Sequence, residues 1–146
     1  MTVYNWRRKA KDLLYFYPET KKLLAEGEYD IITRFGRHTD RRYEKGGISD
    51  PTAMKMLLME EDASLKELRK EAEAVERLLR VLDTGRRPDR MKMKLVQHVY
   101  LKRDMTLLRY SMEVSVSDRT VKRWNDQLLR ILAVYMGWLD VKEIYK

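Results

Sequence analysis

The sequence predicts an all-α protein, in which an N-terminal helical hairpin with one long helix precedes a C-terminal helix-turn-helix. Glycine and proline are scarce, at 6 and 3 of 146 residues, and long runs rich in Lys, Glu, Leu and Arg separate them. Apolar residues recur in these runs at helical spacing. A short basic segment at 84–89 suggests two domains, a hairpin or oligomerisation region at 1–85 and a DNA-binding region at 86–146.

Residues 4–35 predict two helical runs that are separated near Pro18. The stretch 36–49 is polar and contains Gly46 and Gly47, so it predicts a loop.

The triplet Ser49-Asp50-Pro51 predicts the beginning of a long helix over 51–83. Asp50 can accept hydrogen bonds from first-turn amides, and Pro51 needs no amide partner at the first helical position. Gly85 follows as a natural stop. The apolar residues of this helix form a stripe with a spacing of three and four, which requires a partner helix. The sequence leaves two partners open, the N-terminal helices of the same chain or the same helix of a second copy in a homodimer.

The C-terminal region predicts a helix near 91–101 and then two amphipathic helices that meet at 115–117. Asp104 or Thr106 can cap the first of the two, and Ser117 can cap the second, which runs to about residue 136. Six positions match those that a helix-turn-helix buries between its helices: Tyr110, Ser111, Val114, Val116, Val121 and Trp124. Ser115 stands where such motifs often have a glycine with positive φ, so a serine there departs from the pattern and weakens the match.

Charge indicates the partner of this motif. The net charge is +8, and residues 86–146 carry 14 Lys and Arg against 7 Asp and Glu. Such an excess favours a polyanion, and we expect double-stranded DNA. Arginine can bind a guanine edge with two hydrogen bonds, whereas lysine more often contacts phosphate. We therefore expect Arg119 and Arg123 to contact bases and Lys122, Lys102 and Arg109 to contact the backbone, with Ser117, Thr120 and Asp126 completing the DNA-binding surface.

The stretch ISDPTAM at 48–54, the long charged helix after it and SDRTVKRW at 117–124 together resemble the ArpU/RinA-type late-gene transcriptional regulators of phages and prophages. Their C-terminal part is similar to region 4 of sigma factors. The resemblance spans most of residues 45–140 and implies an activator of phage packaging, morphogenesis or lysis genes.

The sequence gives less support to other classes of function. The two histidines, His38 and His98, are far apart and cysteine is absent, so we expect neither a metal site nor a cofactor. No nucleophile and base pair is apparent, so we expect no enzyme. No run is apolar enough for a membrane helix, and we expect a cytoplasmic protein. One alternative is a phage small terminase subunit that recognises DNA for packaging, and another is a module that contacts host RNA polymerase.

Overall fold

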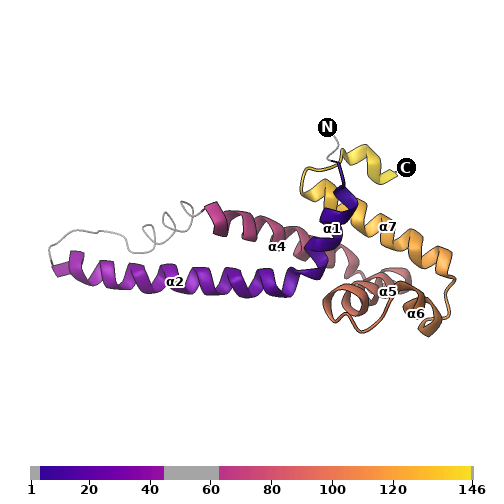
Figure 1. The fold of residues 1–146 in the computed structure, drawn as a ribbon, viewed down its shortest axis with the longest axis horizontal. Helices are drawn as coiled ribbons and strands as arrows, with labels where there is room; N and C mark the ends of the chain where they lie inside the picture. Colours follow the sequence, from indigo (N-terminus) through magenta and orange to yellow (C-terminus); the bar gives the residue numbers. More distant parts are fainter. Residues whose placement is uncertain (1–3, 45–62, 146) are drawn as a thin grey trace. The chain divides into compact units, whose positions relative to one another are not determined.

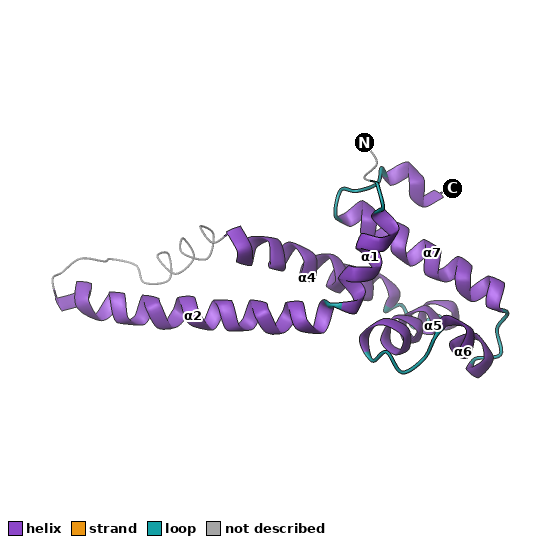
Figure 2. Cartoon of the chain, in the orientation of Figure 1, coloured by secondary structure: helices purple, strands orange, loops and turns teal. Residues whose placement is uncertain are grey.

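A computed structural model describes residues 4–44 and 63–145, and its regular elements within these ranges are all helical (Figure 2). The all-α prediction is therefore confirmed. The chain divides into two compact units, Met1–Pro18 with Glu71–Lys146 (unit 1) and Glu19–Lys70 (unit 2). The sequence predicts a boundary at residue 85 because a short basic segment lies there. The two units are instead defined by contacts between residues, and their limits differ from that boundary. No helix in the described part of the chain is long and apolar enough to cross a bilayer.

Unit 2 is a helical hairpin. The helix α2 (Tyr17–Glu44) and the beginning of α4 (Ala63–Leu82) run side by side (Figure 1). Gly27 lies against Leu65 so closely that a Cβ atom at residue 27 would be 2.3 Å from Leu65 Cδ2, which explains a glycine inside this helix. Arg69 and Glu28 form an ion pair at 3.5 Å. Leu65 and Arg69 of α4 thus contact α2 of the same chain.

The expected loop at 36–49 is wrong for its first part, because α2 continues to Glu44. A single glycine at position 36 costs a helix only about 1 kcal/mol, and no proline follows it before residue 44. The remainder of that loop and residues 51–62 of the expected long helix, with its cap at Asp50, lie outside the described residues. The predicted break near Pro18 is confirmed, since a single residue, Phe16, separates the end of α1 (Trp6–Tyr15) from the beginning of α2.

Unit 1 is built around α7 (Asp118–Tyr135), which packs against α1, α5 (Arg87–Leu95) and α6 (Leu107–Glu113). A short 3-10 helix, η2 (Val141–Tyr145), also contacts it. The largest fully buried side chains of this unit come from all of its main helices: Leu14, Val75, Leu78, Leu95, Val96, Tyr100, Tyr110, Val121, Leu128, Leu129 and Leu132. Because α1 supplies part of this core, the N-terminal residues fold with the C-terminal region.

The helix expected over 91–101 begins earlier and changes its winding. Pro88 occupies the first turn of α5, where its missing amide costs nothing. From Val96 to Leu101 the chain forms a π-helix, η1, and the amide of Lys102 donates to the carbonyl of Gln97 at 2.7 Å. Such wide turns are rare and often lie at functional sites.

Candidate nucleic-acid interface

The helices α6 and α7 are joined by a four-residue turn and are capped at the residues that the sequence predicted. The Thr106 hydroxyl accepts a hydrogen bond from the Arg109 amide at 3.1 Å. The Ser117 hydroxyl accepts from the Thr120 amide at 3.2 Å. Each cap satisfies an amide that the first turn of the helix leaves without a partner. Of the two candidates for the first cap, Asp104 and Thr106, the structure has Thr106, and the cap predicted at Ser117 is confirmed.

The turn depends on one residue in the left-handed region. Ser115 has a φ of 55°, the conformation for which glycine is usually selected. Its amide donates to the carbonyl of Met112 at 3.3 Å, and the next amide, of Val116, donates to the carbonyl of Ser111 at 3.0 Å. The turn therefore ends α6 with its own hydrogen bonds, and it fixes the direction in which α7 begins.

The contact between α6 and α7 is formed by only part of the predicted set. Tyr110, Ser111 and Val121 are buried. Val114, Val116 and Trp124 are half-buried, so Trp124 does not hold the two helices together in the way the sequence suggested. The buried residues of α7 include Asn125, Leu129 and Ala133. These positions are buried because α1 also packs against the helix.

Asn125 occupies a position in the core that an apolar pattern does not reveal. Its side chain is 7% exposed, and its Oδ1 atom accepts a hydrogen bond from the Tyr100 hydroxyl. Tyr100 comes from η1, so this bond joins η1 to the middle of α7. Burial raises the pKa of Tyr100, and Tyr15 adds to this effect. The phenol therefore remains a hydrogen-bond donor at neutral pH.

Three cations lie on the outer face at the beginning of α7. Arg119, Lys122 and Arg123 are exposed, and their spacing of three and four places them on one side of the helix. Lys122 forms an ion pair with Asp118 at 2.9 Å. Among the described residues, the side chains of Arg119 and Arg123 have no ion-pair partner. Their guanidinium groups are thus free to bind an external acceptor.

The remaining predicted site residues divide into two groups. Lys102 and Arg109 are exposed, and Ser117 donates to the Thr120 hydroxyl at 2.8 Å while it caps the helix. Asp126, in contrast, forms ion pairs with Arg7 at 2.9 Å and with Arg130 at 2.6 Å. The structure thus gives Asp126 a role in joining α1 to α7, and its carboxylate is already paired.

This ion-pair network has a titration consequence. Burial alone would raise the pKa of Asp126, but the hydrogen bonds and positive charges of Arg130 and Arg7 outweigh it and lower that pKa below its ordinary value. The sequence pattern does not reveal this network, because Arg7 and Asp126 are 119 positions apart. The same holds for Tyr100 and Asn125.

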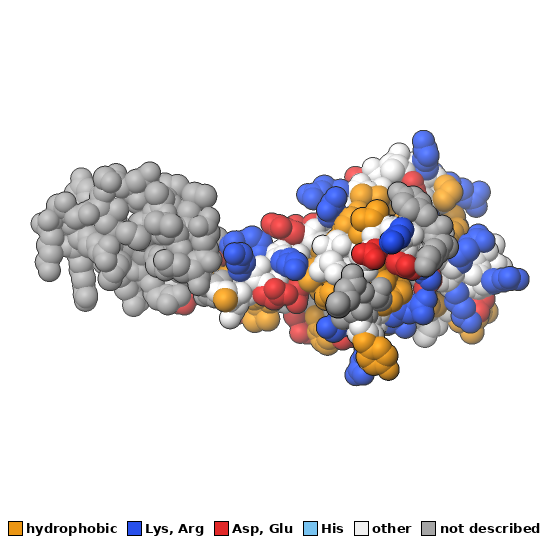
Figure 3. All heavy atoms as spheres, turned by 90° about the horizontal axis from the view of Figure 1, so that it is seen from above, with side chains coloured by type: hydrophobic (Ala, Val, Ile, Leu, Met, Phe, Trp, Pro, Cys, Tyr) orange, Lys and Arg blue, Asp and Glu red, His pale blue; other side chains and the backbone are white. Residues whose placement is uncertain are grey.

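The surface around α7 is rich in basic side chains. On the face of unit 1 shown in Figure 3, Lys and Arg side chains gather toward the end at which α7 begins. In the segment before and within α5, Arg86, Arg87 and Arg90 are exposed. The local excess of positive charge in residues 86–146 therefore reaches the surface, where it can attract a polyanion.

Comparisons with known proteins add no relative: no protein-family model, curated protein or solved structure matches this chain.

Proposed function

We propose that this chain binds double-stranded DNA in a sequence-specific manner, with the beginning of α7 in the major groove. The observation that carries the proposal is the exposed set Arg119, Lys122 and Arg123, on one side of a helix that directly follows a capped tight turn. A helix that reads DNA from the major groove presents its first turns to the base edges. Its opposite side must be fixed by a core, and Val121 and Leu128 are buried there.

The two kinds of cation suit different tasks. Arg119 and Arg123 are unpaired among the described residues and can each donate two hydrogen bonds to the O6 and N7 atoms of a guanine. Lys122 is already close to Asp118 and acts as a point charge, which suits a phosphate oxygen. Arg109 and Lys102 are further candidates for backbone contacts.

Among the classes of DNA-binding protein, we propose that this chain is a transcriptional regulator of phage late genes, most simply an activator. The resemblance of residues 48–54 and 117–124 to ArpU/RinA-type regulators supports this role. A contact with host RNA polymerase belongs to the same proposal. The protein then acts by binding rather than by catalysis.

The test begins with selection of bound sites from random duplexes by the full chain. Arg123→Ala should then weaken binding to the selected site by about 1–3 kcal/mol per lost base contact, with less loss on unrelated duplexes. Lys122→Ala should weaken all duplexes about equally. If Arg123→Ala and Lys122→Ala both weakened the affinity for the selected duplex and for unrelated duplexes by the same amount, the roles assigned to the two residues would be contradicted.

The regulatory role has a separate test. We expect a monomer or dimer in a native mass measurement of the full chain. A closed ring of many copies would contradict a regulator and would support the alternative of a small terminase subunit.

A further inference from the structure

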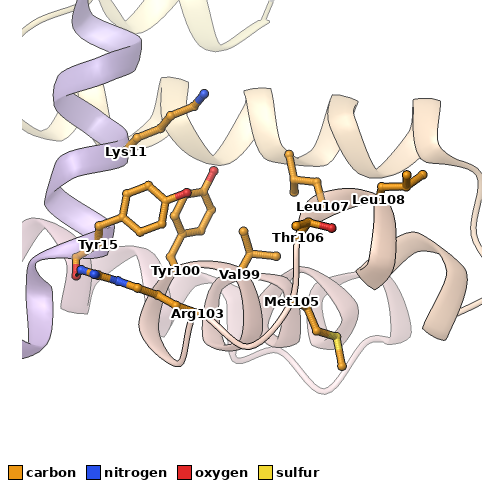
Figure 4. Close-up of a pocket in the computed structure, with 9 residues that line it drawn as sticks. All are labelled: Lys11, Tyr15, Val99, Tyr100, Arg103, Met105, Thr106, Leu107 and Leu108. Carbon is orange, nitrogen blue, oxygen red and sulfur yellow. Dashed lines mark hydrogen bonds between the residues drawn. The ribbon is translucent and has the colours of Figure 1, made fainter.

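A hollow of about 470 Å³ lies within unit 1 (Figure 4). Lys11 and Tyr15 line it from α1, and Val99 and Tyr100 line it from η1. The rest of its wall is formed by the segment 103–108, which leads into α6. This volume lies in the range of small-molecule sites in proteins. The proposed DNA contact uses none of the side chains that line it.

The wall of the hollow is held in place on both sides. The guanidinium of Arg103 donates to the carbonyl of Tyr15 at 2.6 Å and lies 5.3 Å from the centre of the Tyr15 ring. The backbone of Arg103 has a φ of 56°, and such left-handed residues cluster at ligand sites. At the other end of the segment, Thr106 is fixed because it caps α6. Hydrogen bonds therefore anchor the segment at both Arg103 and Thr106.

The lining combines positive charge with apolar walls. Of the described residues that line the hollow, Lys11 and Arg103 are cationic and none is acidic. Lys11 extends from α1 over the hollow (Figure 4), and it has no ion-pair partner in the described part of the chain. The carboxylate of Asp104, which lies next to Arg103 in the sequence, is within hydrogen-bond distance of Nδ1 of His98, at 3.1 Å. An anion would find a free positive charge at this rim.

The rest of the lining suits a flat apolar group. Tyr15 and Leu107 line the hollow and are half-buried, so each offers part of its side chain to a ligand. Val99 and Tyr100 are buried, and the Tyr100 ring packs against the Tyr15 ring at 4.9 Å with a tilt of 57°. Aromatic rings of a ligand pack well against tilted or offset tyrosines. Leu107 approaches from the α6 side, opposite Tyr15 (Figure 4).

We propose that this hollow binds a small organic anion with a flat apolar body, such as an aromatic carboxylate or sulfonate. Lys11 pairs with the anionic group, while Tyr15 and Leu107 contact the ring. Neither the DNA contact nor the resemblance to late-gene regulators is needed for this site.

Anilinonaphthalene sulfonate is a suitable probe, because its fluorescence rises when it leaves water. We expect saturable binding of one probe molecule to the full chain. Lys11→Glu should weaken it by about tenfold, because an attraction becomes a repulsion. The neutral analogue N-phenylnaphthylamine should bind wild type and Lys11→Glu equally. Leu107→Trp fills the hollow and should weaken both probes.

Arg8→Glu is the matched control, since Arg8 is also exposed on α1 but does not line the hollow. It should leave the affinity for the sulfonate unchanged. Each variant is first checked for cooperative unfolding, because partly folded chains also bind this dye. The proposal is overturned if the folded wild type shows no saturable binding, if Arg8→Glu and Lys11→Glu lose the same affinity, or if Leu107→Trp has no effect.

Discussion

Replacing Tyr100 by phenylalanine should destabilise unit 1 by leaving a polar atom buried without a partner. Tyr100 is 1% exposed and Asn125 is 7% exposed, and the hydroxyl of the first donates to Oδ1 of the second. The substitution removes the donor and little volume. A buried acceptor that loses its only partner costs about 1–3 kcal/mol. In a chain of 146 residues, this loss lowers the Tm by about 2–4 °C per kcal/mol.

The physical reason can be isolated with a double-mutant cycle. Asn125→Leu alone strands the Tyr100 hydroxyl and should cost a similar amount. In the double variant no polar group is left unpaired, so its loss should be smaller than the sum of the single losses by about 1 kcal/mol or more. Urea unfolding at neutral pH, followed by far-ultraviolet circular dichroism, measures all four proteins. Additive losses, or a neutral Tyr100→Phe variant, would refute the argument that this bond joins η1 to α7.

Three further predictions concern the turn and the charges of α7. Ser115→Val should cost about 1–2 kcal/mol in urea unfolding, because a β-branched residue is strained at positive φ, and an unchanged stability would contradict the turn geometry. Asp126 has a lowered pKa in the folded state, so its contribution to stability is present above about pH 4 and is lost as the pH falls through the folded pKa. The stability difference between wild type and Asp126→Asn should accordingly shrink on acidification from pH 5, and a difference that grows would exclude this linkage. Asp118→Asn frees Lys122 and removes a charge that repels phosphate. It should tighten binding to every duplex and increase the salt dependence by about one phosphate contact in fluorescence anisotropy, whereas weaker binding would count against DNA at this surface.

Local chemistry made much of this fold predictable. The caps at Thr106 and Ser117 and the left-handed position at Ser115 follow from residues only a few positions apart. The predicted break near Pro18 follows in the same way. The exposure of Arg119 and Arg123 follows from helical spacing, once Val121 is assigned to the core.

The remainder depends on contacts between distant segments. α1 covers α7, and this turns the buried arc toward Asn125 and leaves Trp124 half-buried. Asp126 was expected at the DNA surface, yet Arg7 from α1 pairs with it. The continuation of α2 beyond Gly36 shows a different limit, since a glycine lowers helix stability without ending the helix.

The most direct test of the central claim is a titration of the full chain, labelled with nitrogen-15, with a selected duplex, followed by the backbone amide spectrum. We predict saturable shifts concentrated at residues 117–124, at the beginning of α7, and much smaller shifts for α2. Absence of shifts at low salt, or shifts confined to α2 and α4, would contradict the proposal that the exposed arginines of α7 bind DNA.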